Sequence, residues 1–111
     1  MGDATGAGAR AETLVQELEK RIEAVAVAAG RAVGRPRVFA MEWLDPPFTA
    51  GHWVPQLVQL AGGRDELARE GFPSTQISWG RVIDYDPEVI VLMPCGFTSG
   101  RTLEELSLIH I

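Results

Sequence analysis

The sequence predicts an α/β fold built around a parallel sheet. Two short apolar runs, Val38–Met41 and Glu88–Met93, are typical of strands, and the second is apolar enough to predict burial on both faces, as in a parallel sheet. Apolar residues at helical spacing precede and follow each run. The resulting order is helix, strand, helix, helix, strand, helix, which is the pattern of α/β layers.

Composition limits the classes of partner. The chain has 111 residues, enough for one domain, and its 15 acidic and 10 basic side chains give a net charge of −5. Nucleic-acid surfaces and polybasic membrane patches need clustered Lys and Arg, so we expect neither. No apolar run reaches the ~18 residues of a membrane-spanning helix. The single cysteine, Cys95, excludes an internal disulfide and a cysteine-rich zinc site.

The first helix is predicted at about 11–29, after a Gly- and Ala-rich segment, 1–10, that we expect to be frayed. Its apolar residues are spaced three or four positions apart, which places them on one face: Leu14, Leu18, Ile22, Val25 and Ala29. Its second half is small and apolar nearly all round, so we expect it to lie against another part of the protein. Two glycines and a proline break the helix within 30–36.

The first strand, at about 37–43, is followed by a decorated loop and a second helix. The loop opens with a stiff turn, Asp45–Pro47, and the helix is predicted at about 52–61. Pro55 fits the first turn of that helix, where a missing N–H costs nothing, and Gly62-Gly63 ends it.

The second half of the chain adds two helices around the second strand. Segment 64–75 is polar and turn-rich, which is compatible with a short helical turn or an edge strand. Ser78 is the predicted N-cap of a helix at 79–85. Thr98 or Ser99 is expected to cap the final helix.

The end of the chain differs from the rest. Two clear strands are too few for independent stability, since small sheets need three or more, so we expect the chain to be incomplete. The last six residues, LSLIHI, are apolar without a stop signal, and a common sequencing-library transposon end read in frame encodes the same hexapeptide. We therefore expect 107–111 to be non-native and leave them, His110 included, out of functional reasoning.

Chemistry-bearing residues follow both predicted strands. Glu42 and Trp43 end the first strand, and the loop Pro94–Phe97 follows the second. If the strands are parallel neighbours, both loops open on the edge of the sheet where ligands of α/β proteins bind. Five side chains are then expected to line one concavity: Phe48, His52, Trp53, Cys95 and Phe97. Glu42 is either a cleft carboxylate beside them or a solvated strand end.

The polar candidates also have plain structural interpretations. As a nucleophile, Cys95 would need His52 as its base, with no third group evident, so a packed or incidental thiol is the simpler interpretation. His52 is more simply a helix cap or a surface residue than a ligand. Because the native part has no second His and no close His, Asp and Glu spacing, we expect no metal site and no catalytic residue.

The aromatic candidates remain open between two roles. Phe48 and Trp53 lie in a loop between glycine and prolines, where they could face a planar ligand or cover the helix. Trp79 fits a hydrophobic staple at a helix start better than a docking surface. The loops TAGHW and PCGF lack the glycine patterns of nucleotide sites.

Taken together, these segments resemble a known family. EWLDPPFTAGHWVPQLVQLAGG, followed by ISWGRVIDYDPEVIVLMPCGF, is similar to the C-terminal lobe of cobalamin-binding proteins of ABC transporters. These proteins belong to the periplasmic binding family for cobalamin, haem and iron siderophores. The resemblance covers about residues 10–105, with the motifs in the same order, and it implies two Rossmann-like α/β lobes joined by one long helix, with the ligand in the cleft between them.

The resemblance also implies a division of the chain. Residues 1–36 correspond to a flexible start and the second half of the linking helix, 37–106 to part of the C-terminal lobe, and 107–111 to the non-native tail. Phe48 resembles an aromatic residue that touches the corrin ligand. The resemblance places two further pairs on cleft loops: His52 with Trp53, and Cys95 with Phe97.

One departure from the family concerns docking to the transporter. Many relatives carry an acidic residue at the position of Gly80, where a glutamate docks onto arginines of the membrane transporter. Either Asp84 or Glu88 substitutes for it, or docking by this lobe is weaker, or the protein is not a standard transport component.

The implied function is ligand capture without catalysis. The resemblance implies a monomeric, extracytoplasmic binding component that delivers cobalamin or a related corrinoid to an ABC permease, with cobalamin as cargo and not as cofactor. An iron-siderophore or haem receptor is the alternative on the same scaffold, but such sites favour Arg and Tyr, whereas Trp, Phe and His are present here. An α/β enzyme that uses Cys95 with His52 is a third interpretation.

Overall fold

Residues 2–109 of the chain are described in a computed structural model. They fall into two compact units, Met1–Val33 and Gly34–Ile111, each with its own elements. His110 and Ile111, in the tail that we expect to be non-native, lie outside the described residues.

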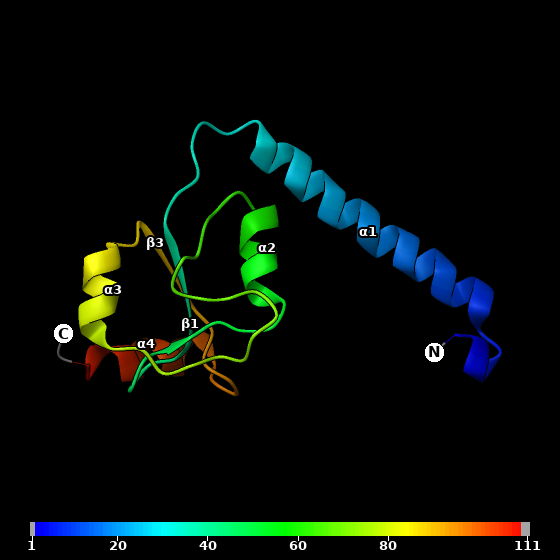
Figure 1. Ribbon diagram of the computed structural model, residues 1–111. Helices are drawn as coiled ribbons and strands as arrows, with labels where there is room; N and C mark the ends of the chain where they lie inside the picture. The colour runs from blue at the N-terminus through cyan, green and yellow to red at the C-terminus, as the bar shows by residue number, and fades with distance from the viewer. Residues whose placement is uncertain (1, 110–111) are drawn as a thin grey trace. The chain divides into compact units, whose positions relative to one another are not determined.

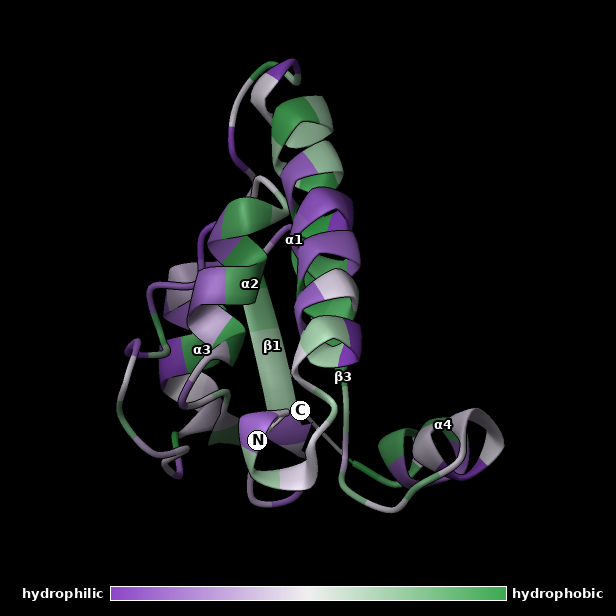
Figure 2. Cartoon of the chain, turned by 90° about the vertical axis from the view of Figure 1, so that its right-hand side faces the viewer, coloured by the Kyte–Doolittle hydropathy of each residue, from purple (hydrophilic) through white to green (hydrophobic). Residues whose placement is uncertain are grey.

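The first unit is a long helix that follows a short turn. A 3-10 helix, η1 (Asp3–Thr5), ends at Gly6, whose φ of 67° lies in the left-handed region, and α1 (Gly8–Gly30) follows. The described residues of 1–10 thus form this turn and the first turn of α1, and the expected flexibility of this segment stays a prediction. No residue of α1 is buried, and Figure 2 shows hydrophobic residues at intervals along it, with polar residues between them. The partner expected for its apolar face stays a prediction.

Three strands form the sheet of the second unit, in the order β2-β1-β3. The central strand, β1 (Val38–Trp43), runs parallel to β3 (Val89–Leu92) and antiparallel to β2 (Phe48–Thr49). The predicted α/β fold and the parallel pairing of the two strands are confirmed. β2 was not expected, because two residues after a proline turn are too few to show strand periodicity.

Helices α2 (Val54–Leu60) and α3 (Trp79–Tyr85) lie on opposite sides of β1 (Figure 1). Phe39 and Met41 of β1 are fully buried and pack in one cluster with Val82 of α3. Trp79 packs against the same cluster, as expected for a residue that closes a helix start onto the core.

The helix ends follow the predicted capping residues. The Ser78 hydroxyl accepts a hydrogen bond from the N–H of Arg81 at the start of α3 (3.3 Å). Thr98 does the same for the N–H of Arg101 at the start of α4 (Ser99–Ser107). The second helix begins two residues later than predicted, at Val54, because His52 adopts a left-handed conformation, with φ of 56°.

The expectation that β3 is buried on both faces is wrong. Val89, Ile90 and Val91 are exposed by 44%, 47% and 42%. β3 is the outer strand: β1 pairs with one of its edges, and no strand among residues 2–109 pairs with the other. An apolar strand can be buried, but how much of its surface is buried depends on how many elements pack against it.

Segment 71–77 lies along β2 and the loop that follows it. The N–H of Thr49 donates to the carbonyl of Thr75 (2.9 Å), and the N–H of His52 donates to the carbonyl of Phe72 (2.7 Å). An isolated antiparallel bridge joins Phe48 to Gln76. Of the two alternatives left open for this part of the chain, the edge strand is the closer one.

Candidate functional site

The carboxyl ends of β1 and β3 meet at one edge of the sheet. The N–H of Met93 donates to the carbonyl of Met41 (3.0 Å), so the two strands finish side by side. The loops that follow them, and helix α4, lie at the lower end of the sheet in Figure 1. The prediction that both loops open on the same edge is confirmed.

A β-bulge at the end of β1 shapes the site. Met41 pairs with Thr49 and Trp43 pairs with Phe48, so Glu42 is an extra residue with no partner on β2. A bulge breaks the alternation of side chains between the two faces of a strand. As a result, the consecutive residues Glu42 and Trp43 line the same open hollow of about 320 Å³, together with Phe48 and Ser74.

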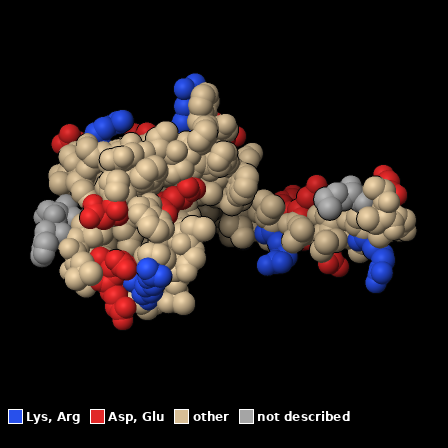
Figure 3. Space-filling view, turned by 90° about the horizontal axis from the view of Figure 1, so that it is seen from below, with Lys and Arg blue, Asp and Glu red and all other residues tan. Residues whose placement is uncertain are grey.

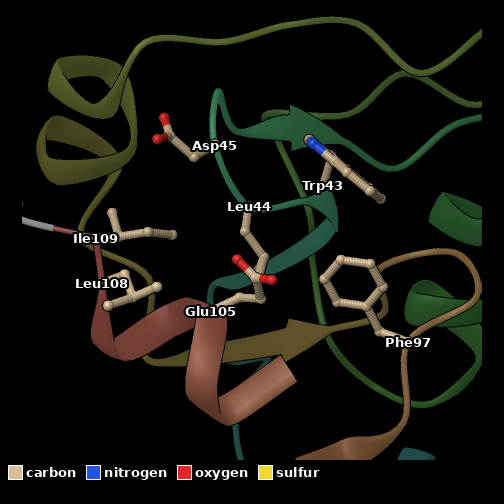
Figure 4. Close-up of a pocket in the computed structure, with 7 residues that line it drawn as sticks. All are labelled: Trp43, Leu44, Asp45, Phe97, Glu105, Leu108 and Ile109. Carbon is tan, nitrogen blue, oxygen red and sulfur yellow. The ribbon is translucent and has the colours of Figure 1, made fainter. Parts of the chain in front are cut away.

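A second hollow, of about 140 Å³, begins at the same tryptophan (Figure 4). Its native lining comes from the end of β1, from the loop after β3 and from α4: Trp43, Leu44, Asp45, Phe97 and Glu105. Leu108 and Ile109, in the tail that we expect to be non-native, also line it. Trp43 is therefore the wall that the two hollows share.

Aromatic and cationic contacts hold this wall in place. The rings of Trp43 and Phe97 meet edge to face, with centroids 5.2 Å apart and an interplanar angle of 61°. The Arg101 guanidinium lies 4.0 Å from the centroid of Phe97, and its Nε lies 3.7 Å from a carboxylate oxygen of Glu105. Edge-to-face and cation–π contacts each add to the stability of a half-buried ring, so Trp43 and Phe97 are pre-arranged.

Trp43 was predicted to end the first strand but was not among the candidate ligand contacts. Its side chain is 38% exposed although it lies in the central strand. The available signal was a tryptophan at the end of an apolar strand, two residues before the Asp45–Pro47 turn. The bulge that turns it toward Phe48 leaves no mark in the sequence.

Glu42 and Phe48 lie where a ligand could meet them. Glu42 is half-buried, and one of its carboxylate oxygens accepts a hydrogen bond from the N–H of Gly51 (3.3 Å). Phe48 is also half-buried and lines the larger hollow beside it. Both residues were named from the sequence, and the structure places them together.

His52 and Trp53 form a separate aromatic pair. Their ring centroids lie 5.8 Å apart, and Trp53 is 68% exposed as the N-cap residue of α2. Neither residue lines either of the two hollows that contain Trp43. Neither of these two hollows contains all five predicted side chains, and a ligand contact of His52 or Trp53 stays a prediction.

Cys95 is an exposed free thiol in a tight turn. The N–H of Phe97 donates to the carbonyl of Pro94 (3.3 Å), and Gly96 supplies the left-handed conformation, with φ of 76°. Within residues 2–109, no hydrogen bond joins the thiol to His52. The turn presents Phe97 to the hollow and leaves Cys95 at the surface.

The described residues show neither a metal-binding cluster nor a membrane-spanning helix. Residues 2–109 contain no group of three His, Cys, Asp or Glu side chains placed to hold a metal ion. None of the described helices is both long and apolar enough to cross a bilayer.

The chain is similar to known periplasmic binding proteins. A family model described as periplasmic binding protein matches residues 1–107. The solved structure of a periplasmic binding protein from Veillonella parvula is similar, with a TM-score of 0.76 and 23% identity over 94% of this chain and 38% of that one. A structure described as that of "a possible an iron-binding (periplasmic solute-binding) protein" from Staphylococcus epidermidis has a TM-score of 0.73 and 16% identity, over 97% of this chain and 42% of that one.

These likenesses show the fold. The chain spans about two-fifths of the length of the two solved proteins. No curated protein matches it.

Proposed function

The chain belongs to the periplasmic binding protein family, and on that basis we propose that it is part of the extracytoplasmic, ligand-capturing component of an ABC importer. Residues 37–106 would form part of its C-terminal lobe, with residues 1–36 as the end of the helix that joins the lobes. The whole-protein role is a proposal because the chain spans 38% and 42% of the solved relatives.

The proposed ligand is cobalamin or a related corrinoid. One observation carries this proposal: Trp43 walls both hollows at the carboxyl edge of the sheet, with Phe48 on one side and Phe97 on the other. A corrin is a broad macrocycle whose apolar faces and edges suit such rings, and burying apolar surface stabilises binding by about 25 cal/mol per Å². The metal arrives inside the ligand, so the protein needs no metal cage of its own.

An iron chelate on the same scaffold is the second candidate. The description of the Staphylococcus epidermidis protein as a possible iron-binding protein favours it. The residues that line the two hollows weigh against it, because they include neither Arg nor Tyr, the side chains suited to an anionic chelate.

The test is a titration of the complete protein encoded by the gene that carries this chain. Cyanocobalamin, haemin and a ferric siderophore are added separately, and the dissociation constants are measured by calorimetry and by tryptophan fluorescence. We expect micromolar or tighter binding of cyanocobalamin alone. Binding of haemin or the siderophore without cyanocobalamin would replace the proposed ligand, and no binding of any of the three would refute the proposal.

Docking to the permease is proposed to use Asp84. Gly80 offers no carboxylate, and of the two substitutes Glu88 is already engaged: it accepts a hydrogen bond from the N–H of Arg37 (2.8 Å) and pairs with the Arg37 guanidinium (3.6 Å). Asp84 lies one turn beyond Gly80 on α3 and makes no hydrogen bond or ion pair within residues 2–109. With the complete protein and its permease in vesicles, Asp84→Asn should lower uptake while leaving the ligand dissociation constant unchanged. Uptake equal to that of the wild type would remove Asp84 from this role.

A further inference from the structure

The ionisable groups that line the two hollows are all carboxylates, those of Glu42, Asp45 and Glu105. The other polar side-chain groups of the lining are the indole N–H of Trp43, which is a donor, and the hydroxyl of Ser74, which donates to the carbonyl of Thr49 (2.6 Å). The lining residues include no Lys, Arg or His. Figure 3 views the second unit from the carboxyl edge of the sheet and shows acidic side chains gathered there, with a basic group beside one of them.

Two of these carboxylates have oxygens that accept no hydrogen bond within residues 2–109. One oxygen of Glu42 accepts from the N–H of Gly51, and its other oxygen accepts no hydrogen bond within residues 2–109. Asp45, which is exposed and lies to the left of Trp43 in Figure 4, accepts none in the same part of the chain. A carboxylate at such a place gains from a donor on the ligand and repels a second carboxylate.

Arg101 contacts two of the lining residues, Phe97 and Glu105, but does not itself line a hollow. Its guanidinium lies over the ring of Phe97 and pairs with Glu105. It therefore reduces the negative charge of Glu105 only in part, and the carboxylates of Glu42 and Asp45 have no basic partner within residues 2–109.

We infer that the Trp43 site selects a macrocycle whose rim carries N–H donors, such as amides, over the same macrocycle with carboxylates on its rim. The shared indole wall meets the apolar edge of the ring, and Glu42, Asp45 and Glu105 meet its substituents. This inference rests on the proposed corrinoid function and names the substituent chemistry within that class. Selectivity arises because a rim amide gains a charge-assisted hydrogen bond, whereas a rim carboxylate meets like charge.

The test compares two ligands that share one ring and one metal. Dicyanocobinamide carries amides around the corrin, and dicyanocobyrinic acid carries carboxylates. Each is titrated into the complete protein at pH 7.5, in low salt and in 0.5 M salt. We expect dicyanocobinamide to bind at least tenfold more tightly in low salt, with a smaller ratio in high salt because salt screens exposed charges.

Variants assign the selectivity to the named side chains. Glu42→Gln, Asp45→Asn and Glu105→Gln together should lower the ratio to below threefold, and each single variant is also measured in case the triple variant does not fold. Glu104→Gln is the matched control: it lies beside Glu105 on α4, is exposed and lines neither hollow, so the ratio should not change.

The outcomes separate the two proposals. If neither corrinoid binds, the proposed function fails and this inference fails with it. If both bind equally, or if the carboxylate form binds more tightly, the function stands and the inference is overturned. Tighter binding of the carboxylate form that is lost in Arg101→Gln would make Arg101 the selecting residue instead.

Discussion

Gly51 has no room for a side chain. A Cβ built on it would lie 2.8 Å from the carbonyl carbon of Pro73 and nearer still to the backbone nitrogen of Ser74. The close approach lets the loop after β2 pair with segment 71–77, and it also places the N–H of Gly51 on Glu42. A glycine here therefore shapes both the fold and the larger hollow.

We expect Gly51→Ala to lower the free energy of unfolding of the chain by about 1–3 kcal/mol, because the added methyl group must displace backbone. Urea denaturation followed by circular dichroism measures the change. Gly100→Ala is the control, since a Cβ there meets no atom within 4 Å and lies in α4, where alanine is the better helix former. A midpoint for Gly51→Ala equal to that of the wild type would show that the segments are less closely packed than described.

Asp65 holds the amide groups of two segments together. Its carboxylate accepts hydrogen bonds from the N–H groups of Ala40 (3.1 Å), Leu67 (3.2 Å) and Ala68 (3.2 Å). Burial raises the pKa of Asp65 above its ordinary value, and the three backbone hydrogen bonds lower it by less. The carboxyl group of Asp65 therefore stays protonated to a higher pH in the native state than in the unfolded state.

The sign of the pH dependence follows from that raised pKa. As pH rises from about 4 through the raised native pKa, the unfolded state binds fewer protons than the native state, so this group's contribution to stability falls. We expect the wild type to lose free energy of unfolding relative to Asp65→Asn across this window. Denaturation at a series of pH values checks it, with Asp84→Asn as the control for an exposed carboxyl group. A difference between wild type and Asp65→Asn that stays constant with pH would contradict the raised pKa.

At the scale of elements, helix α3 begins at its cap. Ser78 has an extended backbone, and its hydroxyl satisfies the N–H of Arg81, one of the donors that a helix start leaves unpaired. Replacing Ser78 with alanine should cost about 1 kcal/mol of stability. Thermal or urea unfolding measures it, and Ser78→Asp, which keeps an acceptor at the cap, should retain most of the stability. Equal loss in both variants would mean that the cap bond contributes little.

The same element shows what sequence could predict. Ser78, Thr98 and the apolar runs each carry a local chemical signal, so the caps and the two parallel strands were predicted correctly. β2 and the bulge at Glu42 depend on how one strand pairs with another, and no local pattern specifies that pairing. The exposure of β3 likewise depends on its neighbours in space.

In the candidate site, too, some residues could be predicted from the sequence and others could not. Glu42, Phe48 and Phe97 were predicted because they follow strands whose ends meet. Trp43 lines both hollows because of the bulge, which the sequence does not reveal. His52 has a left-handed backbone and its N–H donates to the carbonyl of Phe72, so it lies in another part of the loop. The sequence predicted that the candidate residues lie near one edge of the sheet. It could not predict which of them line the two hollows.

At the scale of the whole molecule, the hollows are small for the proposed ligand. Their volumes of about 140 and 320 Å³ lie below or at the lower end of the roughly 300–1,000 Å³ of drug-sized sites. A corrinoid would therefore have to be held from a second side, as in a cleft between two lobes. We propose that most of the binding surface comes from residues beyond this chain.

It follows that residues 1–106 alone should bind cyanocobalamin more weakly than micromolar. Calorimetry on that fragment, compared with the complete protein encoded by the gene, measures the difference. The fragment also omits the tail that we expect to be non-native, so an unchanged fold by circular dichroism is the control. Micromolar binding by the fragment would show that this unit suffices without a second lobe.

The most direct test of the central claim is the dissociation constant of cyanocobalamin for Phe48→Ala in the complete protein. Phe48 lines the larger hollow opposite Trp43, so removing its ring should weaken binding by about 1–3 kcal/mol. Phe72→Ala is the matched control, because that exposed ring lies over Arg69 and lines neither hollow with Trp43. An unchanged constant for Phe48→Ala, with the wild type binding normally, would contradict a ligand held against these rings.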